Sequence, residues 1–276
     1  MRLPDAADRL DAEIIRGGLA ALGVPLAVEV RMRCASTNSE LLERSDTDLP
    51  VLLLCDEQTA GRGRRGRRWH ANPGAALMFS LRWNFAGQAV RLAGLSLAAG
   101  VGIAKALRAL GAHGLALKWP NDLLAPAAKG GGKLGGILIE TRSSAGRTAG
   151  VQCVAVIGVG LNFRHMPGLE ARLRRRVATL DELIDPLPAR NEIAIHVAAG
   201  LVRTLQAFED AGLGAFKGDW EAMHANQGEP LKVRTADGRV IAGIADGIAA
   251  DGSLLVRTRR GVQSIHSGSM VRARTA

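Results

Sequence analysis

The chain has 276 residues and a formal net charge of +10, with 47% hydrophobic residues and 3% aromatics. A chain of this length and hydrophobic content can bury a sizeable core, which excludes a disordered protein. It contains 30 Arg, 6 Lys and no Tyr, so a mechanism that needs a tyrosine acid, base or nucleophile is excluded. The positive charge fits either a soluble basic protein or a nucleic-acid-binding protein, and the position of the charge must distinguish the two.

Targeting and metal motifs are missing from the sequence. The acidic N-terminal stretch lacks the apolar run of a secretory signal. The longest uncharged apolar run, residues 92–104, is shorter than the ~18–20 residues that span a bilayer. Cys34, Cys55 and Cys153 are odd in number and widely spaced, which is typical of reduced thiols in a cytosolic protein. No HExxH or CxxC is present, so we predict a cytoplasmic protein without a membrane segment or zinc.

Apolar periodicity and capping residues predict the elements of the first part of the chain. Leu10, Ile14 and Leu19 recur at helical spacing, and a glycine closes the run. Thr37 and Glu40 have the spacing of a capping box, which predicts a helix start. In chain order we expect a helix over 5–23, a strand over 26–32, a helix opening at 36–38, a strand over 51–55, a loop over 61–68, a strand over 77–83 and a helix over 92–110.

The second part of the chain is predicted to hold more strands, then helices, then a β-rich end. Thr179 and Glu182 repeat the capping-box spacing, and three Asp-Gly pairs after residue 228 indicate tight turns between short strands. We expect strands over 115–119, 135–140 and 151–159, a polar loop over 142–149, and helices over 168–185, 190–212 and 215–225. The predicted fold is α+β, with a mixed or antiparallel central sheet over residues 1–227 and a small β-barrel over 228–276.

Common nucleotide and hydrolase motifs do not fit. Residues 129–133, KGGGK, lack the earlier Gly and the following Ser or Thr of a P-loop. Residues 158–163, GVGLNF, lack the third glycine of a dinucleotide-binding fingerprint. No GxSxG is present, so a hydrolase nucleophile elbow is also unsupported.

An arginine-glycine loop at residues 61–68, GRGRRGRR, carries five of the positive charges. Its three glycines would let the backbone wrap a phosphate, while guanidinium groups donate paired hydrogen bonds to phosphate oxygens. The same loop would also suit an exposed basic patch or a nucleic-acid-binding arm. Because the chain has only four Trp and five Phe, it offers few platforms for base stacking, which disfavours nucleic acid.

Five segments together resemble the biotin protein ligases. They are CASTNSE (34–40), DEQTAGRGRRGRRW (56–69), LKWPNDLL (117–124), KLGGILIE (133–140) and VIGVGLNF (156–163), and the resemblance covers roughly residues 28–276. It implies a class II synthetase-like catalytic domain and a C-terminal SH3-like barrel. It also implies an AMP-forming enzyme that uses ATP to make biotinyl-5′-adenylate and transfers biotin to a lysine of the biotin carboxyl carrier protein of acetyl-CoA carboxylase.

The resemblance implies which residues bind each substrate. For biotin they are Ser36, Thr37, Asn38, Gln58, Gly61, Arg62, Gly63, Arg64, Lys133, Gly135 and Gly136. For ATP and the adenylate they are Arg62, Arg64, Arg65, Arg67, Trp69, Lys118, Asn121, Lys133 and Asn162. Some of these residues also have a structural explanation. Ser36, Thr37 and Asn38 could simply open a helix, Trp69 could belong to the core, and Asn162 could form a turn.

Three of these positions, Arg64, Lys133 and Asp122, are predicted to be catalytic. Attack of a biotin carboxylate on the α-phosphate of ATP brings two anions together and needs fixed cations, which the resemblance assigns to Arg64 and Lys133. Asp122 follows a proline that ends a strand, and we predict that it orients or deprotonates the carrier lysine; a structural ion pair with Lys118 is the alternative. Mg²⁺ is expected with ATP, but no ligands for it can be assigned.

The sequence departs from the family pattern in two places. About thirty residues precede the first matched strand, too few for a winged helix-turn-helix, so we expect a ligase that does not bind DNA. Residues 123–132 look longer and richer in glycine than is usual in the family. Lipoate and octanoate transferases of the same architecture stay the alternative, monomer and homodimer stay open, and the arginines at 172 and 174–176 have no assigned role.

Overall fold

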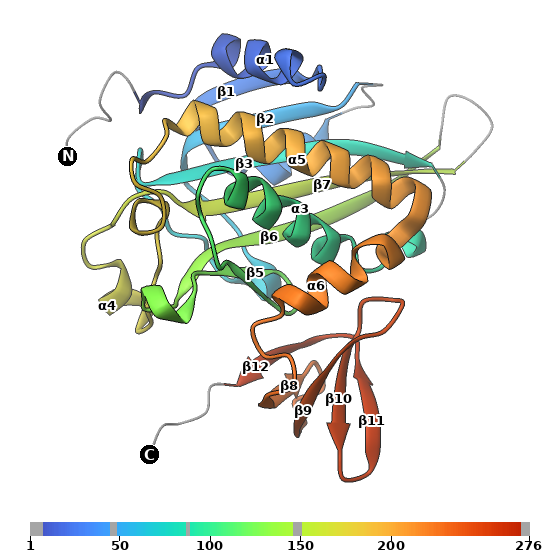
Figure 1. Cartoon of the computed structure of the whole chain (residues 1–276). Coiled ribbons are helices and arrows are strands. Elements are labelled where there is room, and N and C mark those ends of the chain that lie inside the picture. The colour runs from blue at the N-terminus through green and yellow to red at the C-terminus, as the bar shows by residue number, and fades with distance from the viewer. Residues whose placement is uncertain (1–7, 45–48, 87–88, 146–150, 272–276) are drawn as a thin grey trace.

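The computed structural model describes residues 8–44, 49–86, 89–145 and 151–271. Its central sheet is built from β1 (Ala27–Cys34), β2 (Val51–Gln58), β3 (Ala76–Ala86), β4 (Ala116–Lys118), β5 (Asp122–Leu124), β6 (Lys133–Ala145) and β7 (Val151–Asn162). The strand order is β1-β2-β3-β7-β6-β5-β4 (Figure 1). Only the β1–β2 pair among these neighbours is parallel, which confirms the predicted mixed sheet.

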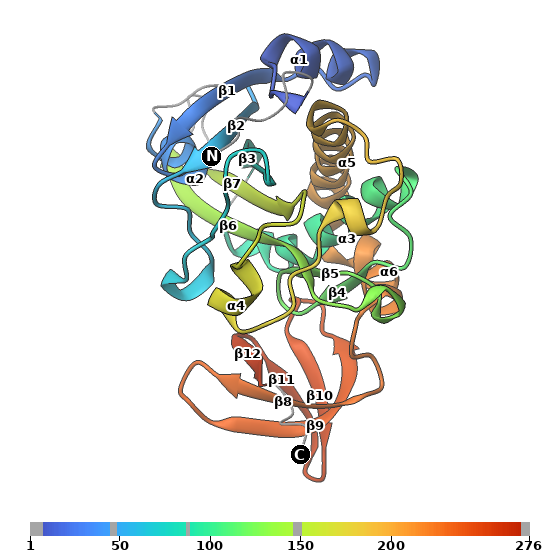
Figure 2. The ribbon, with the colours of Figure 1, turned by 90° about the vertical axis from the view of Figure 1, so that its left-hand side faces the viewer.

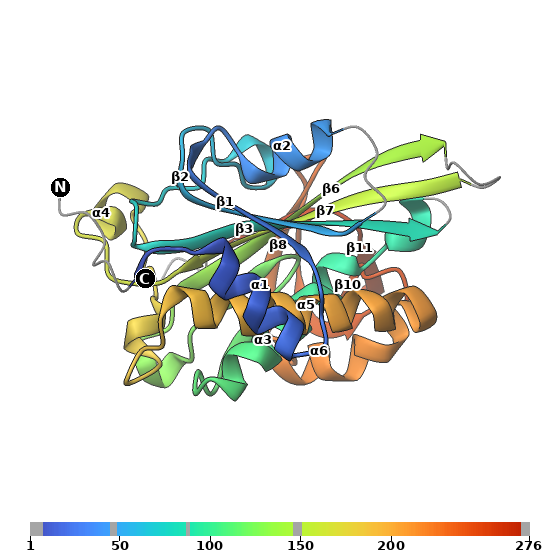
Figure 3. The ribbon, with the colours of Figure 1, turned by 90° about the horizontal axis from the view of Figure 1, so that it is seen from above.

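Helices cover the two faces of this sheet unequally. They are α1 (Ala12–Ala21), α2 (Thr37–Glu43), α3 (Leu95–Ala109), α4 (Leu169–Leu173), α5 (Arg190–Ala211) and α6 (Lys217–Met223). Figure 3 shows α1, α3, α5 and α6 on one side of the sheet and α2 on the other. The face that carries α2 is therefore the less covered one. Within the described residues, no helix is long and apolar enough to cross a membrane.

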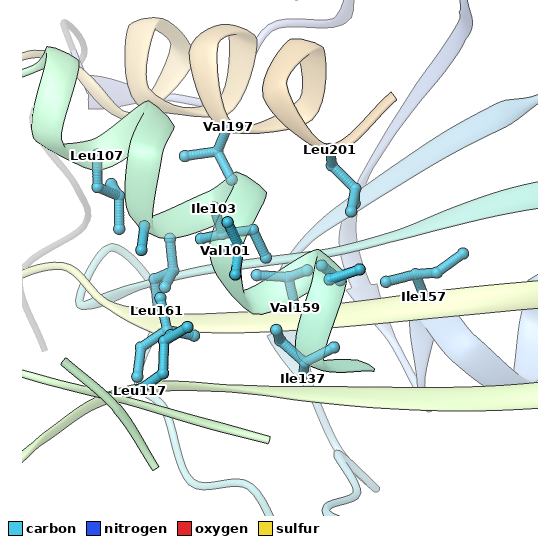
Figure 4. Packing of buried hydrophobic residues seen from close by; sticks show 14 of the residues in the cluster. Val101, Ile103, Leu107, Leu117, Ile137, Ile157, Val159, Leu161, Val197 and Leu201 are labelled. Atoms are coloured by element: carbon cyan, nitrogen blue, oxygen red, sulfur yellow. The ribbon is translucent and has the colours of Figure 1, made fainter. Parts of the chain in front are cut away.

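The main core lies between the sheet and the α3–α5 layer. Side chains of Ile157, Val159 and Leu161 on β7 point toward that layer, where they meet residues such as Ile103 and Leu201 (Figure 4). Because successive side chains on a strand point to opposite faces, the residues between them on β7 face α2 instead. Those intermediate positions are Gly158 and Gly160, so the strand is bare on the α2 side.

A buried arginine ties the N-terminal segment to the sheet. Arg190 at the start of α5 is fully buried, and its Nη1 lies 2.6 Å from an Asp56 carboxylate oxygen at the end of β2. Its Nη2 also donates to the carbonyl oxygen of Asp8 at 2.7 Å. Asn191 accepts a hydrogen bond from the backbone N–H of Asp11, the residue that caps α1. The segment before α1 is therefore held by α5 and β2 together.

The C-terminal part forms a separate five-stranded antiparallel sheet, as predicted (Figure 2). Its strands are β8 (Pro230–Thr235), β9 (Val240–Ile248), β10 (Leu254–Thr258), β11 (Gly261–Ile265) and β12 (Gly268–Val271), and the predicted boundary at residue 227 falls between α6 and β8. The indole N–H of Trp119, which is 3% exposed, donates to the carbonyl oxygen of Gly252 at 3.1 Å. The Nη2 of Arg65 donates to the hydroxyl of Ser267 at 3.2 Å. The barrel thus contacts both the KWPND segment and the arginine-glycine loop.

Several sequence predictions were wrong in detail. The helix predicted over 168–185 reduces to α4 and a 3₁₀ turn at Leu180–Glu182, because Arg174 adopts a left-handed conformation (φ 49°). Thr179 does not cap that turn with its side chain. At α2 the capping side chain is Ser36 rather than Thr37. β5 was not predicted, and the predicted polar loop at 142–149 is strand up to Ala145, while its residues 146–149 lie outside the described residues.

Candidate functional site

A cavity of about 590 Å³ opens on the face of the sheet that carries α2. Residues from the β2–β3 loop, the β4–β5 hairpin, β6, β7, the segment after α4, and β12 line it. Among the described residues the lining holds one carboxylate, that of Asp122. Its basic side chains are Arg62, Arg64, Arg65, Arg67, Arg68, Lys118, Lys133 and Arg175. This excess of positive charge suits an anionic ligand.

Most residues that the sequence singled out meet in this cavity. Those that line it are Ser36, Thr37, Asn38, Gln58, Arg62, Gly63, Arg64, Arg65, Arg67, Trp69, Lys118, Asn121, Asp122, Lys133 and Gly136. Gly61, Gly135 and Asn162 do not line it. Residues more than a hundred positions apart in sequence are therefore gathered by the sheet into one site.

Two glycines of β7 set the order of side chains along the cavity. A Cβ on Gly158 would collide with the side-chain oxygen of Asn38, and one on Gly160 would lie 2.6 Å from the Trp69 ring. Both side chains therefore rest directly on the strand backbone, as only glycine permits. Since residues two apart on a strand are separated by about 6.6–6.8 Å, Asn38 and Trp69 occupy successive positions along one line.

A hydrogen-bonded polar network forms one end of the cavity. Gln58 accepts at its Oε1 from the backbone N–H of Thr37 at 2.9 Å. The buried hydroxyl of Ser80 donates to Asn38 Oδ1 at 2.6 Å and lies 2.7 Å from the Thr37 hydroxyl. Asn38 in turn donates through its Nδ2 to Glu140 at 2.9 Å. These bonds fix donors and acceptors on a compact surface, which suits a small polar head group.

The arginine-glycine loop is attached to this polar end. Arg62 donates through Nη2 to the Ser39 hydroxyl and to Glu140, both at 3.0 Å. Backbone hydrogen bonds within the loop join Gly63 to Arg67 and Trp69 to Gly61. The loop therefore lies over the cavity with a defined backbone, stabilised at both ends.

A cationic centre lies next to Trp69. Lys133 Nζ is 2.5 Å from an Asp122 carboxylate oxygen and 5.7 Å from the centroid of the Trp69 ring. Both side chains of this ion pair are only partly exposed, at 18% and 24%. Burial lowers the pKa of Arg64 from its ordinary value, the charge of Arg65 lowers it further, and Asp122 opposes both effects. Arg64 nevertheless remains charged at neutral pH, since arginine does not lose its proton in proteins.

Position along the strands explains the residues that miss the cavity. In the β6–β7 ladder Gly136 pairs with Gly160 on the cavity side, whereas a Cβ on Gly135 would meet Leu161 at 2.6 Å. Gly136 therefore faces the cavity, where its backbone can approach a ligand, whereas Gly135 faces Leu161. Asn162 donates through Nδ2 to the carbonyl oxygens of Lys133 and Ala178, at 3.0 and 3.1 Å. Asn162 thus positions the start of β6 rather than facing the cavity.

Sequence reasoning missed several residues of the site. Ser80 and Glu140 complete the polar network, and the barrel adds Gly268, Ser269 and Met270 to the lining. One available signal was the alternation of glycines in GVG at 158–160, because two glycines at i and i+2 open one face of a strand. No comparable local signal marks the barrel residues.

Comparisons with known proteins identify the family. Residues 30–162 match the biotin/lipoate A/B protein ligase family, and residues 228–272 match the biotin protein ligase C-terminal domain. The bifunctional ligase/repressor BirA of Escherichia coli is 34% identical over 255 residues, which is 92% of this chain and 75% of that protein. The chain belongs to the biotin protein ligase family. Family membership makes it an enzyme of the biotin ligase type, as the motifs predicted.

Other members of the biotin protein ligase family are similarly related. The biotin–[acetyl-CoA-carboxylase] ligase of Mycobacterium tuberculosis is 32% identical over 254 residues, 90% of this chain and 89% of that protein. The structure of the Aquifex aeolicus biotin protein ligase in complex with biotin and ATP is 26% identical. The match covers 90% of this chain and 99% of the Aquifex aeolicus chain, with a TM-score of 0.72. These likenesses extend over both the main sheet and the C-terminal sheet.

Proposed function

We propose that this chain activates biotin with ATP to biotinyl-5′-adenylate and transfers biotin to a lysine of a biotin carboxyl carrier protein. The observation that carries the proposal is the arrangement of groups in one cavity. A polar network around Asn38 lies at one end, and Trp69 and the Lys133–Asp122 pair lie beside each other at the next position along β7, with Arg64 near Asp122. This arrangement suits a ligand whose compact polar head is joined to a part that carries both an acyl-phosphate centre and an aromatic base.

Activation begins when a carboxylate oxygen of biotin attacks the α-phosphorus of ATP. The bond from the α-phosphorus to the bridging oxygen breaks, and its electron pair leaves with pyrophosphate. In our proposal Arg64 and Lys133 reduce the repulsion between the carboxylate and the phosphate and stabilise the charge of the transition state. Ser36, Thr37, Asn38 and Gln58 hold the ureido ring, and Trp69 stacks on adenine, as the resemblance implies.

Transfer follows when the amine of the carrier lysine attacks the acyl carbon of the adenylate and AMP leaves. That amine must be neutral to attack, so a base near the acyl carbon is needed. We assign this role to Asp122, because its carboxylate is the one acidic group among the described residues that line the cavity. The names of relatives such as the Mycobacterium tuberculosis ligase support acetyl-CoA carboxylase as the source of the carrier.

Mg²⁺ enters the proposal together with ATP. The described residues hold no group of three or more His, Cys, Asp or Glu side chains that could bind a metal ion. The donor set therefore does not fit a resident metal site held by the protein alone. We propose that any Mg²⁺ is held mainly by the triphosphate oxygens, as is common for this ion.

Adenylate formation with three acyl substrates tests the proposed function. The protein is incubated with ATP, Mg²⁺ and either biotin, lipoate or octanoate, and the acyl-adenylate is measured by chromatography. We expect an adenylate with biotin and little or none with the other two acids. Adenylate formation only with lipoate or octanoate would assign the chain to the alternative transferase function. Salt-sensitive binding of nucleic acid without any adenylate would contradict both readings.

Gly160→Ala should weaken ATP use by displacing Trp69. The new Cβ would lie 2.6 Å from the indole ring, so the ring must leave its place on β7. Stacking on an aromatic side chain contributes about 1–3 kcal/mol per base, so we expect KM for ATP to rise about 5- to 150-fold. Gly218→Ala in α6 is the matched control, because nothing lies within 4 Å of its added Cβ. An unchanged KM for ATP in Gly160→Ala would contradict the stacking role of Trp69.

A further inference from the structure

The arginines at 172–176 fall into two groups by what they contact. Arg172 is hydrogen-bonded to the His70 ring, and Arg176 forms ion pairs with Glu170 at 2.8 Å and Glu182 at 2.7 Å. Arg176 also donates to the carbonyl oxygen of Val177 at 2.7 Å. These two side chains hold the segment after α4 against the rest of the fold. They do not line the cavity.

Arg175 differs from them because it lines the cavity. Its Nε is buried and has no hydrogen-bond partner among the described residues. A buried guanidinium N–H that stays without an acceptor loses its hydration and gains nothing in return. Among the described residues the Arg175 guanidinium also forms no ion pair, so a cation without a counter-charge stands in the cavity wall, and its charge calls for an anion there.

Backbone contacts fix where Arg175 stands along the cavity. Its N–H donates to the carbonyl oxygen of Glu170 at 3.2 Å, which closes the turn after α4. Two residues later Val177 forms a bridge with Lys133, and the N–H of Ala178 donates to the carbonyl oxygen of Lys133 at 3.0 Å. Arg175 therefore lies near the start of β6, beyond Trp69 and away from the polar network around Asn38.

We propose that Arg175 binds the β- and γ-phosphates of ATP and stabilises the pyrophosphate that leaves during adenylation. This inference rests on the proposed function and assigns a further cation to it. When the bond between the α-phosphorus and the bridging oxygen breaks, negative charge grows on the departing oxygen of pyrophosphate. A guanidinium fork can donate to two phosphate oxygens at once, so Arg175 stabilises the leaving group while Arg64 and Lys133 act at the α-phosphate.

The variant Arg175→Gln tests this assignment. Calorimetry measures the affinity of the variant and of the unchanged protein for inorganic pyrophosphate and, in a separate titration, for AMP. Glutamine keeps hydrogen-bonding capacity and removes the charge. Hydrogen bonds to charged groups contribute enough to change affinity about 10- to 100-fold, so we expect pyrophosphate to bind that much more weakly. AMP should bind as it does to the unchanged protein. Equal pyrophosphate affinity in both proteins, or an equal loss for AMP, would overturn the assignment.

Arg174→Gln is the matched control, because Arg174 is the exposed neighbour and does not line the cavity. We expect its pyrophosphate affinity to stay within about twofold of the unchanged protein. Thermal unfolding of both variants checks that they fold.

Biotin-dependent exchange of pyrophosphate into ATP gives the second readout. Arg175→Gln should raise KM for pyrophosphate about 10- to 100-fold, and transfer of biotin from preformed biotinyl-adenylate should be unchanged. Failure of the unchanged protein to catalyse the exchange would contradict the proposed function, and the binding measurements would still test Arg175. Normal exchange in the unchanged protein with the same KM in Arg175→Gln would contradict only the inference.

Discussion

Asp122→Asn should slow the transfer of biotin from preformed biotinyl-adenylate to the carrier lysine by about 10²- to 10⁴-fold, which is the usual contribution of a positioned general base. The asparagine oxygen can still accept a hydrogen bond from Lys133, whose Nζ lies 2.5 Å from the Asp122 carboxylate. We therefore expect adenylate formation to fall by less than about tenfold. Single-turnover assays that start from purified adenylate separate the two steps.

A matched carboxylate provides the control for this variant. Asp219 forms an ion pair with Lys105 at 2.6 Å, but both side chains are exposed and neither lines the cavity. Asp219→Asn should leave both half-reactions unchanged, because Asp219 lies outside the cavity. The fold should also be unaffected, since an exposed ion pair contributes about 0–1 kcal/mol to stability. Unchanged transfer in Asp122→Asn would remove Asp122 from the mechanism. Equal losses in both half-reactions would instead indicate that Asp122 only positions Lys133.

Arg190→Met should destabilise the folded chain by about 3–5 kcal/mol, because it leaves a buried carboxylate without its partner. Arg190 is fully buried and Asp56 is 8% exposed, so water cannot replace the lost ion pair. The variant also loses the hydrogen bonds from Arg190 to the carbonyl oxygen of Asp8. Urea unfolding at equilibrium, followed by tryptophan fluorescence, measures the change in the free energy of unfolding.

Arg16→Met is the control for charge removal alone. Arg16 pairs with Glu13 at 2.6 Å, but the two side chains are 46% and 79% exposed. The expected loss is below about 1 kcal/mol. The double variant with Asp56→Asn and Arg190→Met should recover part of the stability, because no unpaired charge then remains buried. A loss below 1 kcal/mol in Arg190→Met would show that the buried pair does not hold the N-terminal segment.

Local patterns in the sequence were sufficient for much of the fold. The alternating and apolar stretches predicted β1, β2, β3, β4, β6 and β7. The helical spacing of apolar residues predicted α1, the long apolar run predicted α3, and a helix was also expected where α5 lies. The motifs of the arginine-glycine loop and of KLGGI identified the family, which the comparisons confirmed. These features are local, so neighbouring residues contain the information that sets them.

Features that depend on distant contacts could not be predicted in this way. The three-residue strand β5 is too short to show a period and exists because β4 and β6 pair with it on either side. The left-handed Arg174 ends the helix that was expected there, and three residues later Val177 pairs with Lys133, a contact between distant parts of the chain. The pairing of Arg190 with Asp56 joins residues 134 positions apart. Which of Gly135 and Gly136 faces the cavity depends on the register of β6 against β7.

The contacts of the C-terminal barrel also have a consequence for biosynthesis. Gly268, Ser269 and Met270 of β12 form part of the cavity wall, and Arg65 of the arginine-glycine loop reaches Ser267 just before that strand. Domains fold in order as a chain emerges from the ribosome, so the central sheet can form while this wall is still unmade. In a nascent chain at that stage, the cavity would still be open on the side that β12 later forms. The cavity therefore acquires its complete wall only after synthesis has passed the last strand of the barrel.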